Sequence, residues 1–259
     1  MKIYHLFMLR CLFVVASAIP SLGTGALHTF TTADGRSLKA TVLDFNTSNK
    51  KIQIKREDGK KIWIQPSVFS QPDRDYIQQW IAADQFMSPT KFRIKGKKLK
   101  GKTLKKTPKL VNITTKNTTE IAYEITLENK TGFPLNDLKI EYRTFILKKI
   151  LNDEADERND SKRIDGGLFS INIPAGKKVS KTTKPTTLNT SLKHMQEGDY
   201  ITGFDYYQLK VSEEQLEGFW IKIYGPKIDG VRVVREWCNP LDTSKNFVWK
   251  DITPAALAN

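Results

Sequence analysis

The sequence predicts a mainly β protein: a small barrel with a short C-terminal helix, then a separate antiparallel β-sandwich of about seven strands. Apolar residues alternate with polar ones over many short runs, which is the period of a half-buried strand. Clusters of Gly, Pro, Asn and Asp separate these runs, as turns do in an antiparallel fold. One segment near the end of the first unit, residues 70–80, instead fits a helix.

Three runs of alternating apolar residues follow one another in the first unit, at 38–42, 52–54 and 62–64. Asp58-Gly59 separates the second run from the third, and glycine takes the positive φ that a tight hairpin turn requires. Residues 70–80 then fit a short helix that caps the open side, with acidic residues near its positive N-terminal end. A unit of roughly 50 residues can fold alone, although its stability is marginal.

The first unit contains a series of features in this order: Phe30-Thr31, Asp34-Gly35-Arg36, an alternating strand, Lys55–Lys60 and the Ser70, Tyr76 and Trp80 segment. Together they resemble a known family, the Sla-one homology domain one, which is a Src-homology-3-like barrel. The resemblance covers about a fifth of the chain. It implies a module that binds short peptides carrying Asn-Pro-Phe and an acidic residue, with Lys51 or Lys55 matching the lysine that meets the acid. Similar modules occur in secreted proteins of planctomycete- and verrucomicrobia-like bacteria, often beside β-sandwich domains.

The first 26 residues fit a secretory signal peptide. A positively charged start precedes an apolar run at 11–18, which is too short to span a bilayer. Ala16-Ser17-Ala18 and Thr24-Gly25-Ala26 are two candidate cleavage patterns. An uncleaved anchor, or a start site assigned too early, is the alternative interpretation. Export predicts a secreted or periplasmic protein with no membrane span after cleavage.

The chain is strongly basic, with 42 Lys and Arg against 28 Asp and Glu and a formal net charge of +14. An exported protein of this charge suits acidic polysaccharide, lipid head groups or acidic proteins, whereas nucleic acid is a less suitable partner outside the cell. Only Cys238 remains after signal cleavage, so no internal disulfide can form. We expect Cys238 to be a buried small hydrophobe rather than a reactive thiol.

A basic stretch follows the first unit, with ten cations and no acid between Lys91 and Lys109. It fits a flexible connector that binds an acidic polymer, with an affinity that falls as salt rises. It also fits the first edge strand of the next domain, because Phe92 and Ile94 alternate with cations and edge lysines oppose aggregation. The polyanion interpretation assigns the contacts to Lys97, Lys98, Lys105 and Lys106.

Residues 111–250 read as the sandwich, with the clearest alternation at 121–127, 138–144 and 219–223. Short strands spaced by turns are typical of immunoglobulin-like or fibronectin-like domains, although the paired cysteines are missing. That likeness is architectural and carries no function. The predicted division is therefore 1–26 signal peptide, 27–87 barrel, 88–110 basic connector or first edge strand, 111–250 sandwich and 251–259 tail.

No reaction centre is apparent in the sequence. The three histidines share no metal-binding spacing, and neither a nucleophile elbow nor a glycine-rich phosphate loop occurs. Paired acids such as Asp153-Glu154 and Glu213-Glu214 are typical of solvated surface. We therefore expect a non-enzymatic protein without cofactor or metal. A hydrolase with two carboxylates in one pocket is a third, weaker hypothesis.

The barrel offers the best binding surface. If the four isoleucines at 52, 54, 62 and 64 point inward, the residues between them share the outer face. A tryptophan among lysines is a suitable anchor for a partner, although packing against the helix or the second domain is the alternative for Trp63. The first function hypothesis is an exported, adaptor-like module that binds a peptide or partner chain of the cell envelope. The second is a binder of acidic polysaccharide or envelope polymer through Lys91–Lys109. The predicted binding residues are Lys51, Gln53, Lys55, Lys61 and Trp63.

Overall fold

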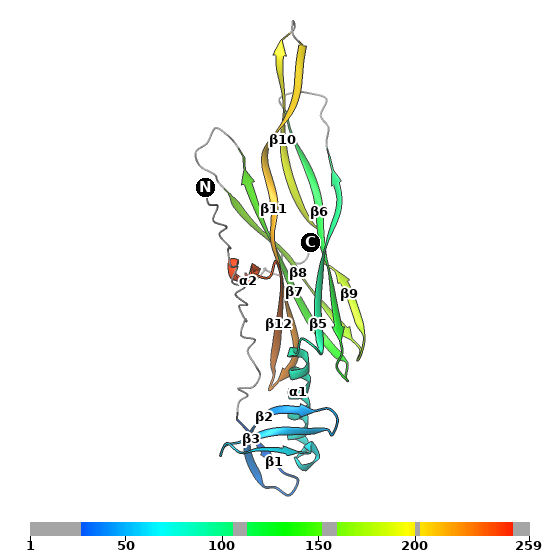
Figure 1. Cartoon of the computed structure of the whole chain (residues 1–259), viewed down its shortest axis with the longest axis vertical. Coiled ribbons are helices and arrows are strands. Elements are labelled where there is room, and N and C mark those ends of the chain that lie inside the picture. Colours follow the sequence, from blue (N-terminus) through cyan, green and yellow to red (C-terminus); the bar gives the residue numbers. More distant parts are fainter. Residues whose placement is uncertain (1–26, 106–112, 152–159, 200–202, 251–259) are drawn as a thin grey trace, which may run out of the picture. The chain divides into compact units, whose positions relative to one another are not determined.

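The computed structural model describes residues 27–105, 113–151, 160–199 and 203–250, and within these ranges the protein is mainly β (Figure 1). The predicted signal peptide and the predicted tail lie outside the described residues. The chain divides into two compact units, Met1–Ile77 and Gln78–Asn259. Each unit has its own antiparallel sheet, of four strands in the first and eight in the second.

The first unit is built from four short strands, a 3-10 turn at Pro66–Val68 and the start of helix α1 (Gln71–Met87). The strands pair in chain order, each with the next. The first and last strands do not pair with each other in the described residues, so backbone hydrogen bonds do not close the sheet into a barrel. The four strands are β1 (His28–Thr31), β2 (Ser37–Asn46), β3 (Lys51–Arg56) and β4 (Lys61–Ile64).

The hairpin between β3 and β4 forms at the predicted Asp58-Gly59 turn. Gly59 has a φ of 83°, which a residue with a side chain rarely adopts, and its amide donates to the Arg56 carbonyl at 2.9 Å. The Arg56 amide in turn donates to the Lys60 carbonyl at 2.9 Å. These bonds fix the register of the two strands that carry the predicted binding residues.

Side chains from β1, β2 and β3 meet the start of α1 in the core of the first unit. Phe30, Ile52, Ile54, Phe69 and Ile77 are fully buried. The ring of Phe30 lies 4.9 Å from that of Phe69. The alternation in β3 therefore sends its isoleucines inward, as the sequence predicted, and its polar residues to the other face.

In its described residues, the second unit contains the end of α1, eight strands and a short helix. Six strands pair in the order β5-β6-β10-β11-β7-β8, while β12 pairs with β11 and β9 with β6. The elements are β5 (Phe92–Leu104), β6 (Thr114–Asn129), β7 (Leu135–Ile150), β8 (Ser161–Ile173), β9 (Lys178–Thr182), β10 (Thr186–Asp199), β11 (Gly203–Ile228), β12 (Val231–Asn239) and α2 (Thr243–Asn246).

The core of the second unit joins strands that are not hydrogen-bonded neighbours. Tyr123 of β6 stacks on Phe219 of β11, with ring centroids 3.9 Å apart. Gly96 of β5 faces the Trp237 indole so closely that an added Cβ would lie 2.3 Å from it, so only glycine fits there. The end of α1 contributes Phe86, which stacks on Phe92 at 4.7 Å. Cys238 is buried and free, as expected.

The sequence allowed two interpretations of the basic stretch, a flexible connector and an edge strand. In the structure, most of its length forms a strand. β5 lies at one end of the strand order and pairs only with β6 in the described residues. Phe92 is buried and Ile94 half-buried, so the apolar residues of the alternation anchor the strand. Its lysines therefore have fixed directions rather than those of a flexible chain. Of the predicted contacts, Lys106 lies outside the described residues.

No helix in the described ranges is both long enough and apolar enough to cross a membrane.

Candidate functional site

Four of the five predicted binding residues form two facing pairs on the first sheet. Gln53 lies directly opposite Trp63, and Lys55 lies opposite Lys61. Residues opposite each other in an antiparallel pair share one face, and so do residues two apart along a strand. Lys51 therefore joins them at the start of β3. These residues, Lys51, Gln53, Lys55, Lys61 and Trp63, are called the β3–β4 face below.

The β3–β4 face is open to solvent at its centre. Trp63 is 43% exposed, and both Lys55 and Lys61 are exposed. Lys51 and Gln53 are half-buried. Trp63 is thus not a core side chain, and a partner that covered its indole would remove a large apolar surface from water.

The charge of this face is positive with one acidic neighbour. Lys51, Lys55 and Lys61 contribute three ammonium groups, while Asp44 of β2 lies opposite Gln53. Lys61 is two residues from Trp63 on β4, a spacing of about 6.6 Å. Lys55 lies opposite Lys61 and is thus a diagonal neighbour of Trp63 at about 7–8 Å, so one short ligand can contact the indole and either lysine. The face therefore suits a ligand that combines an apolar group with an acidic one.

Strand β4 lies at the end of its sheet and pairs only with β3 in the described residues. The outer edge of such a strand presents backbone donors and acceptors to which an extended peptide can add. Trp63 and Lys61 lie on this same strand. Backbone pairing and side-chain contacts could thus act on one peptide.

A buried carboxylate holds β1 against the start of α1 in the first unit. Asp73 accepts hydrogen bonds from Ser70 Oγ at 2.7 Å, from the Thr31 amide at 2.7 Å and from His28 Nε2 at 2.8 Å. The His28 ring also stacks on Tyr76 at 4.0 Å. Burial alone would raise the pKa of Asp73, but the bonds from Ser70, Thr31 and His28 together lower it. The charged form of Asp73 therefore stabilises this unit.

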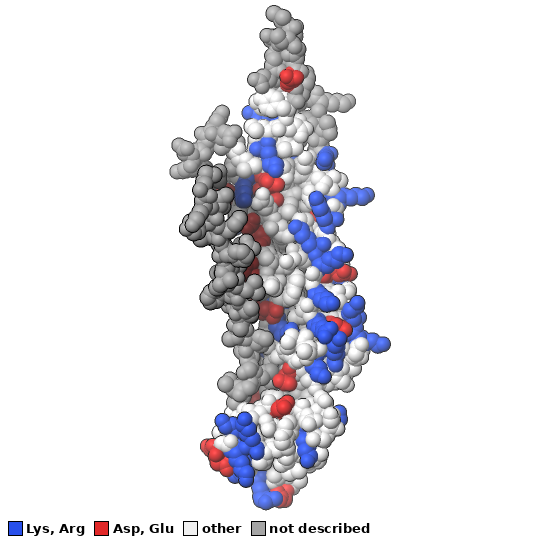
Figure 2. Space-filling view, in the orientation of Figure 1, with Lys and Arg blue, Asp and Glu red and all other residues white. Residues whose placement is uncertain are grey.

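A second basic surface covers the side of the second unit formed by β5 and β9, where Lys and Arg side chains gather (Figure 2). Arg93, Lys95 and Lys97 alternate along β5, so they share one face, and all three are exposed. Lys98 follows Lys97 directly and points to the opposite face. Lys105 lies beyond the end of β5 and is exposed. Of the described residues predicted for polyanion contact, Lys97 and Lys98 therefore lie on opposite faces of β5.

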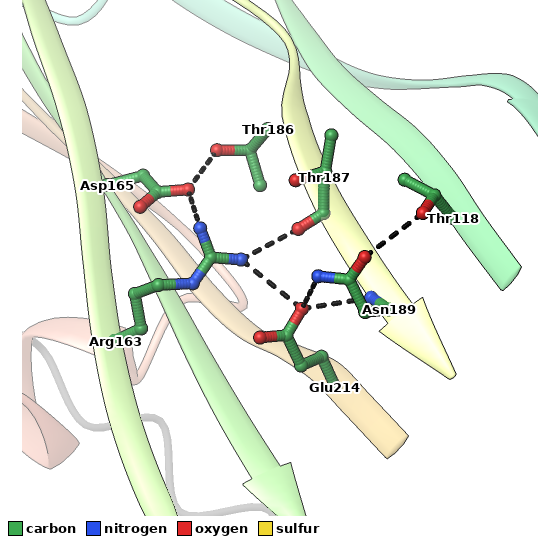
Figure 3. Close-up of polar contacts among 7 residues, drawn as sticks. All are labelled: Thr118, Arg163, Asp165, Thr186, Thr187, Asn189 and Glu214. Atoms are coloured by element: carbon green, nitrogen blue, oxygen red, sulfur yellow. Dashed lines mark hydrogen bonds and ion pairs between the residues drawn. The ribbon is translucent and has the colours of Figure 1, made fainter. Parts of the chain in front are cut away.

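Sequence reasoning missed a polar cluster in the second unit (Figure 3). Arg163 of β8 donates to Asp165 at 2.7 Å and to the Thr187 carbonyl of β10 at 2.7 Å, and it lies 3.4 Å from Glu214 of β11. Glu214 also accepts from the Asn189 side chain at 2.7 Å. Thr118 of β6 donates to the Asn189 side chain at 3.1 Å, so the cluster joins four strands through bonded residues up to 71 positions apart, which no local pattern reveals.

The two carboxylates of this cluster are already engaged. Asp165 accepts from Arg163 and from the Thr186 hydroxyl at 2.6 Å, and Glu214 accepts from the amide and side chain of Asn189. A hydrolytic pair instead needs two carboxyl groups that face a substrate bond. We therefore interpret the cluster as a structural connection between strands. Across the part of the chain that the structure describes, no group of three or more His, Cys, Asp or Glu could hold a metal ion.

Comparison with known proteins leaves the family open. No protein-family model matches the chain, and no curated protein matches it. An X-ray structure of a Northeast Structural Genomics Consortium target is similar at 13% identity and a TM-score of 0.20, over 48% of this chain and 86% of that one. A crystal structure of red sea bream transglutaminase is similar at 9% identity and a TM-score of 0.16, over 81% of this chain and 40% of that one. Scores this low support no argument about fold or function.

Proposed function

We propose that the protein is a non-enzymatic, exported interaction protein that binds an acidic peptide or partner chain through the β3–β4 face. The observation that supports this most is the exposed Trp63 indole on an edge strand, with Lys55 and Lys61 facing each other beside it. Aromatic residues provide much of the binding energy at interfaces, and nearby cations select an acidic ligand. The signal-like N-terminus supports export to the periplasm or beyond.

In this proposal the first unit is a Src-homology-3-like module of the Sla-one homology type. Its support is the order of four strands with a tight β3–β4 hairpin and a helix after them, together with the motifs in the sequence. The second unit is proposed as a β-sandwich that carries the module. Its support is that side chains of β6 pack against those of β7 and β11, with which β6 does not pair.

The proposed ligand is an extended peptide with an aromatic residue and an acid a few positions apart. Its backbone adds to the outer edge of β4, its aromatic side chain lies on Trp63, and its carboxylate meets Lys55 or Lys61. Strand addition supplies affinity that depends little on sequence, so the side-chain contacts decide which peptide binds. The Asn-Pro-Phe motif with a neighbouring acid, which the family resemblance implies, has this composition.

The test is a binding titration of the full chain with a fluorescent peptide that carries Asn-Pro-Phe followed by Asp. Trp63→Ala should weaken binding by about 30-fold, the effect of losing an interface anchor worth about 2 kcal/mol. Tyr207→Ala is the matched control, because Tyr207 is an equally exposed aromatic residue (44%) of the second unit. Equal affinity of the Trp63→Ala and Tyr207→Ala variants would contradict the proposal.

A second candidate function is binding of an acidic polymer through β5. The specific observation is that Arg93, Lys95 and Lys97 project from one face of an ordered edge strand. Glu128 and Glu124 of the neighbouring strand β6 lie opposite Arg93 and Lys97, so Lys95 is the cation of this row without an acid directly opposite. Fixed cations in a row lose less conformational entropy on binding than those of a flexible chain. Retention should still fall steeply with salt, as for any polyanion contact.

This candidate predicts a shift on a heparin column, with heparin as a model acidic polysaccharide. Lys95→Glu combined with Lys97→Glu should lower the salt concentration of elution clearly more than Lys55→Glu combined with Lys61→Glu. Both double variants change the net charge equally, so they separate a local surface from general charge. Equal elution of the two variants would mean that heparin binding depends on the net charge of the chain, +14, and not on the cations of β5.

A further inference from the structure

Residues 243–250 of the second unit pack on β7 through one stacked pair of aromatic rings and through one arginine. Phe247 stacks on Phe145 of β7, with ring centroids 4.4 Å apart. Arg143 of β7 donates from Nε to the Lys250 carbonyl at 2.8 Å and lies 4.4 Å above the Trp249 ring. Because Arg143 is only 3% exposed, this segment has a fixed position on the sheet.

A pocket of about 250 Å³ opens between this segment and strands β7 and β8. Its apolar lining includes Phe145, Ile146, Ile164 and Phe247, of which Phe145 and Ile146 are almost fully buried. The pocket is smaller than the range of about 300–1,000 Å³ that is typical of drug-sized ligands. It therefore has room for a ligand with a single ring. The stacked rings on its wall give it a preformed shape.

Among the residues that the structure describes, the charged ones that line this pocket are all basic: Lys162, Arg163 and Lys250. The charge of Arg163 is balanced by Asp165 and Glu214. Lys162 and Lys250 form no ion pair within the described residues, and the Lys162 ammonium lies 5.9 Å from the centre of the Phe247 ring. Two ammonium groups at the rim of an apolar pocket favour one negative charge on the ligand.

We propose that this pocket binds a small aromatic carboxylate, with the ring beside Phe145 and Phe247 and the carboxylate between Lys162 and Lys250. The two cations and the apolar floor both contribute, so neither a neutral aromatic molecule nor an inorganic anion satisfies the whole site. This site lies within the second unit and does not depend on peptide binding by the β3–β4 face.

The test is a nuclear magnetic resonance titration of the ¹⁵N-labelled full chain with 3-phenylpropanoate. Amide shifts should concentrate at Ile146, Ile164 and Phe247. The neutral analogue 3-phenylpropanamide should bind about tenfold more weakly, because it lacks the charge that the two lysines recognise. Lys162→Glu combined with Lys250→Glu should weaken carboxylate binding by at least about tenfold for the same reason.

The control is Lys177→Glu combined with Lys178→Glu, which changes the net charge equally at two exposed residues outside this pocket. This variant should bind 3-phenylpropanoate as the unchanged chain does. Equal binding of the amide and the carboxylate, equal loss in both double variants, or shifts that avoid the pocket would each overturn the proposal. Because the four substituted lysines are exposed, the variants should keep the fold.

Discussion

Asp73 connects β1, the Ser70 turn and the start of α1 through a single carboxylate. Three hydrogen bonds reach it, and its side chain is 9% exposed. Because its pKa in the folded protein is lowered, folding favours the ionised form. Its contribution to stability is therefore complete above the pKa of the unfolded chain and is lost as pH falls through the lower, folded pKa.

Asp73→Asn should destabilise the first unit by about 2 kcal/mol at neutral pH, since hydrogen bonds to a charged group are lost in a buried place. The difference from the unchanged chain should shrink as the pH falls through the lowered, folded pKa of Asp73, where the carboxylate is increasingly protonated. Urea unfolding followed by the backbone amide signals of the ¹⁵N-labelled first unit measures both effects. Asp75→Asn, an exposed acid on the same helix, should change stability by less than about 0.5 kcal/mol. A deficit that is the same at neutral pH and below the folded pKa would contradict the assignment.

At the same scale, the sequence predicted which side chains share the β3–β4 face, because strand alternation has a period of two and the hairpin turn sets the register. Alternation could not place Arg143 beside Trp249, which are far apart in the chain and meet only in the folded unit. The predicted polyanion residues Lys97 and Lys98 lie on both faces of β5. Lys97 and Lys98 are neighbours on a strand and therefore point in opposite directions.

At the scale of elements, the strands were easier to predict than the helix. The sequence indicated a helix at 70–80, whereas α1 extends to Met87. Its last turns contain Ala83 and Phe86, both fully buried, and Phe86 belongs to the core of the second unit. This end of the helix depends on contacts with residues distant in the sequence, such as the hydrogen bond that Arg235 donates to the Phe86 carbonyl at 3.0 Å, so local pattern alone could not set it.

Strand β5 is a second element whose structure local composition could not decide. Its composition of lysine and glycine resembles a flexible connector, and only Phe92 and Ile94 indicated a strand. Two sets of contacts in the structure make this stretch a strand. Eleven register pairs join β5 to β6, and Gly96 provides the space for the Trp237 indole. Gly96 is thus needed for packing in the second unit.

At the scale of the whole molecule, basic surfaces occur on both units, and their partners are predicted to differ. The β3–β4 face combines cations with an exposed indole, β5 presents cations in a row, and the pocket beside Phe247 combines two lysines with an apolar floor. Net charge alone attracts any polyanion without selecting one. The central claim is therefore that specific recognition resides in the β3–β4 face, where an aromatic anchor and cations act together.

The most direct test of that claim is to map where the acidic Asn-Pro-Phe peptide contacts the ¹⁵N-labelled full chain. We predict that the amide shifts concentrate in Lys51–Arg56 and Lys61–Ile64 and that they disappear in the Trp63→Ala variant. Shifts confined to the second unit, or shifts on β3 and β4 that persist without the indole, would contradict the claim.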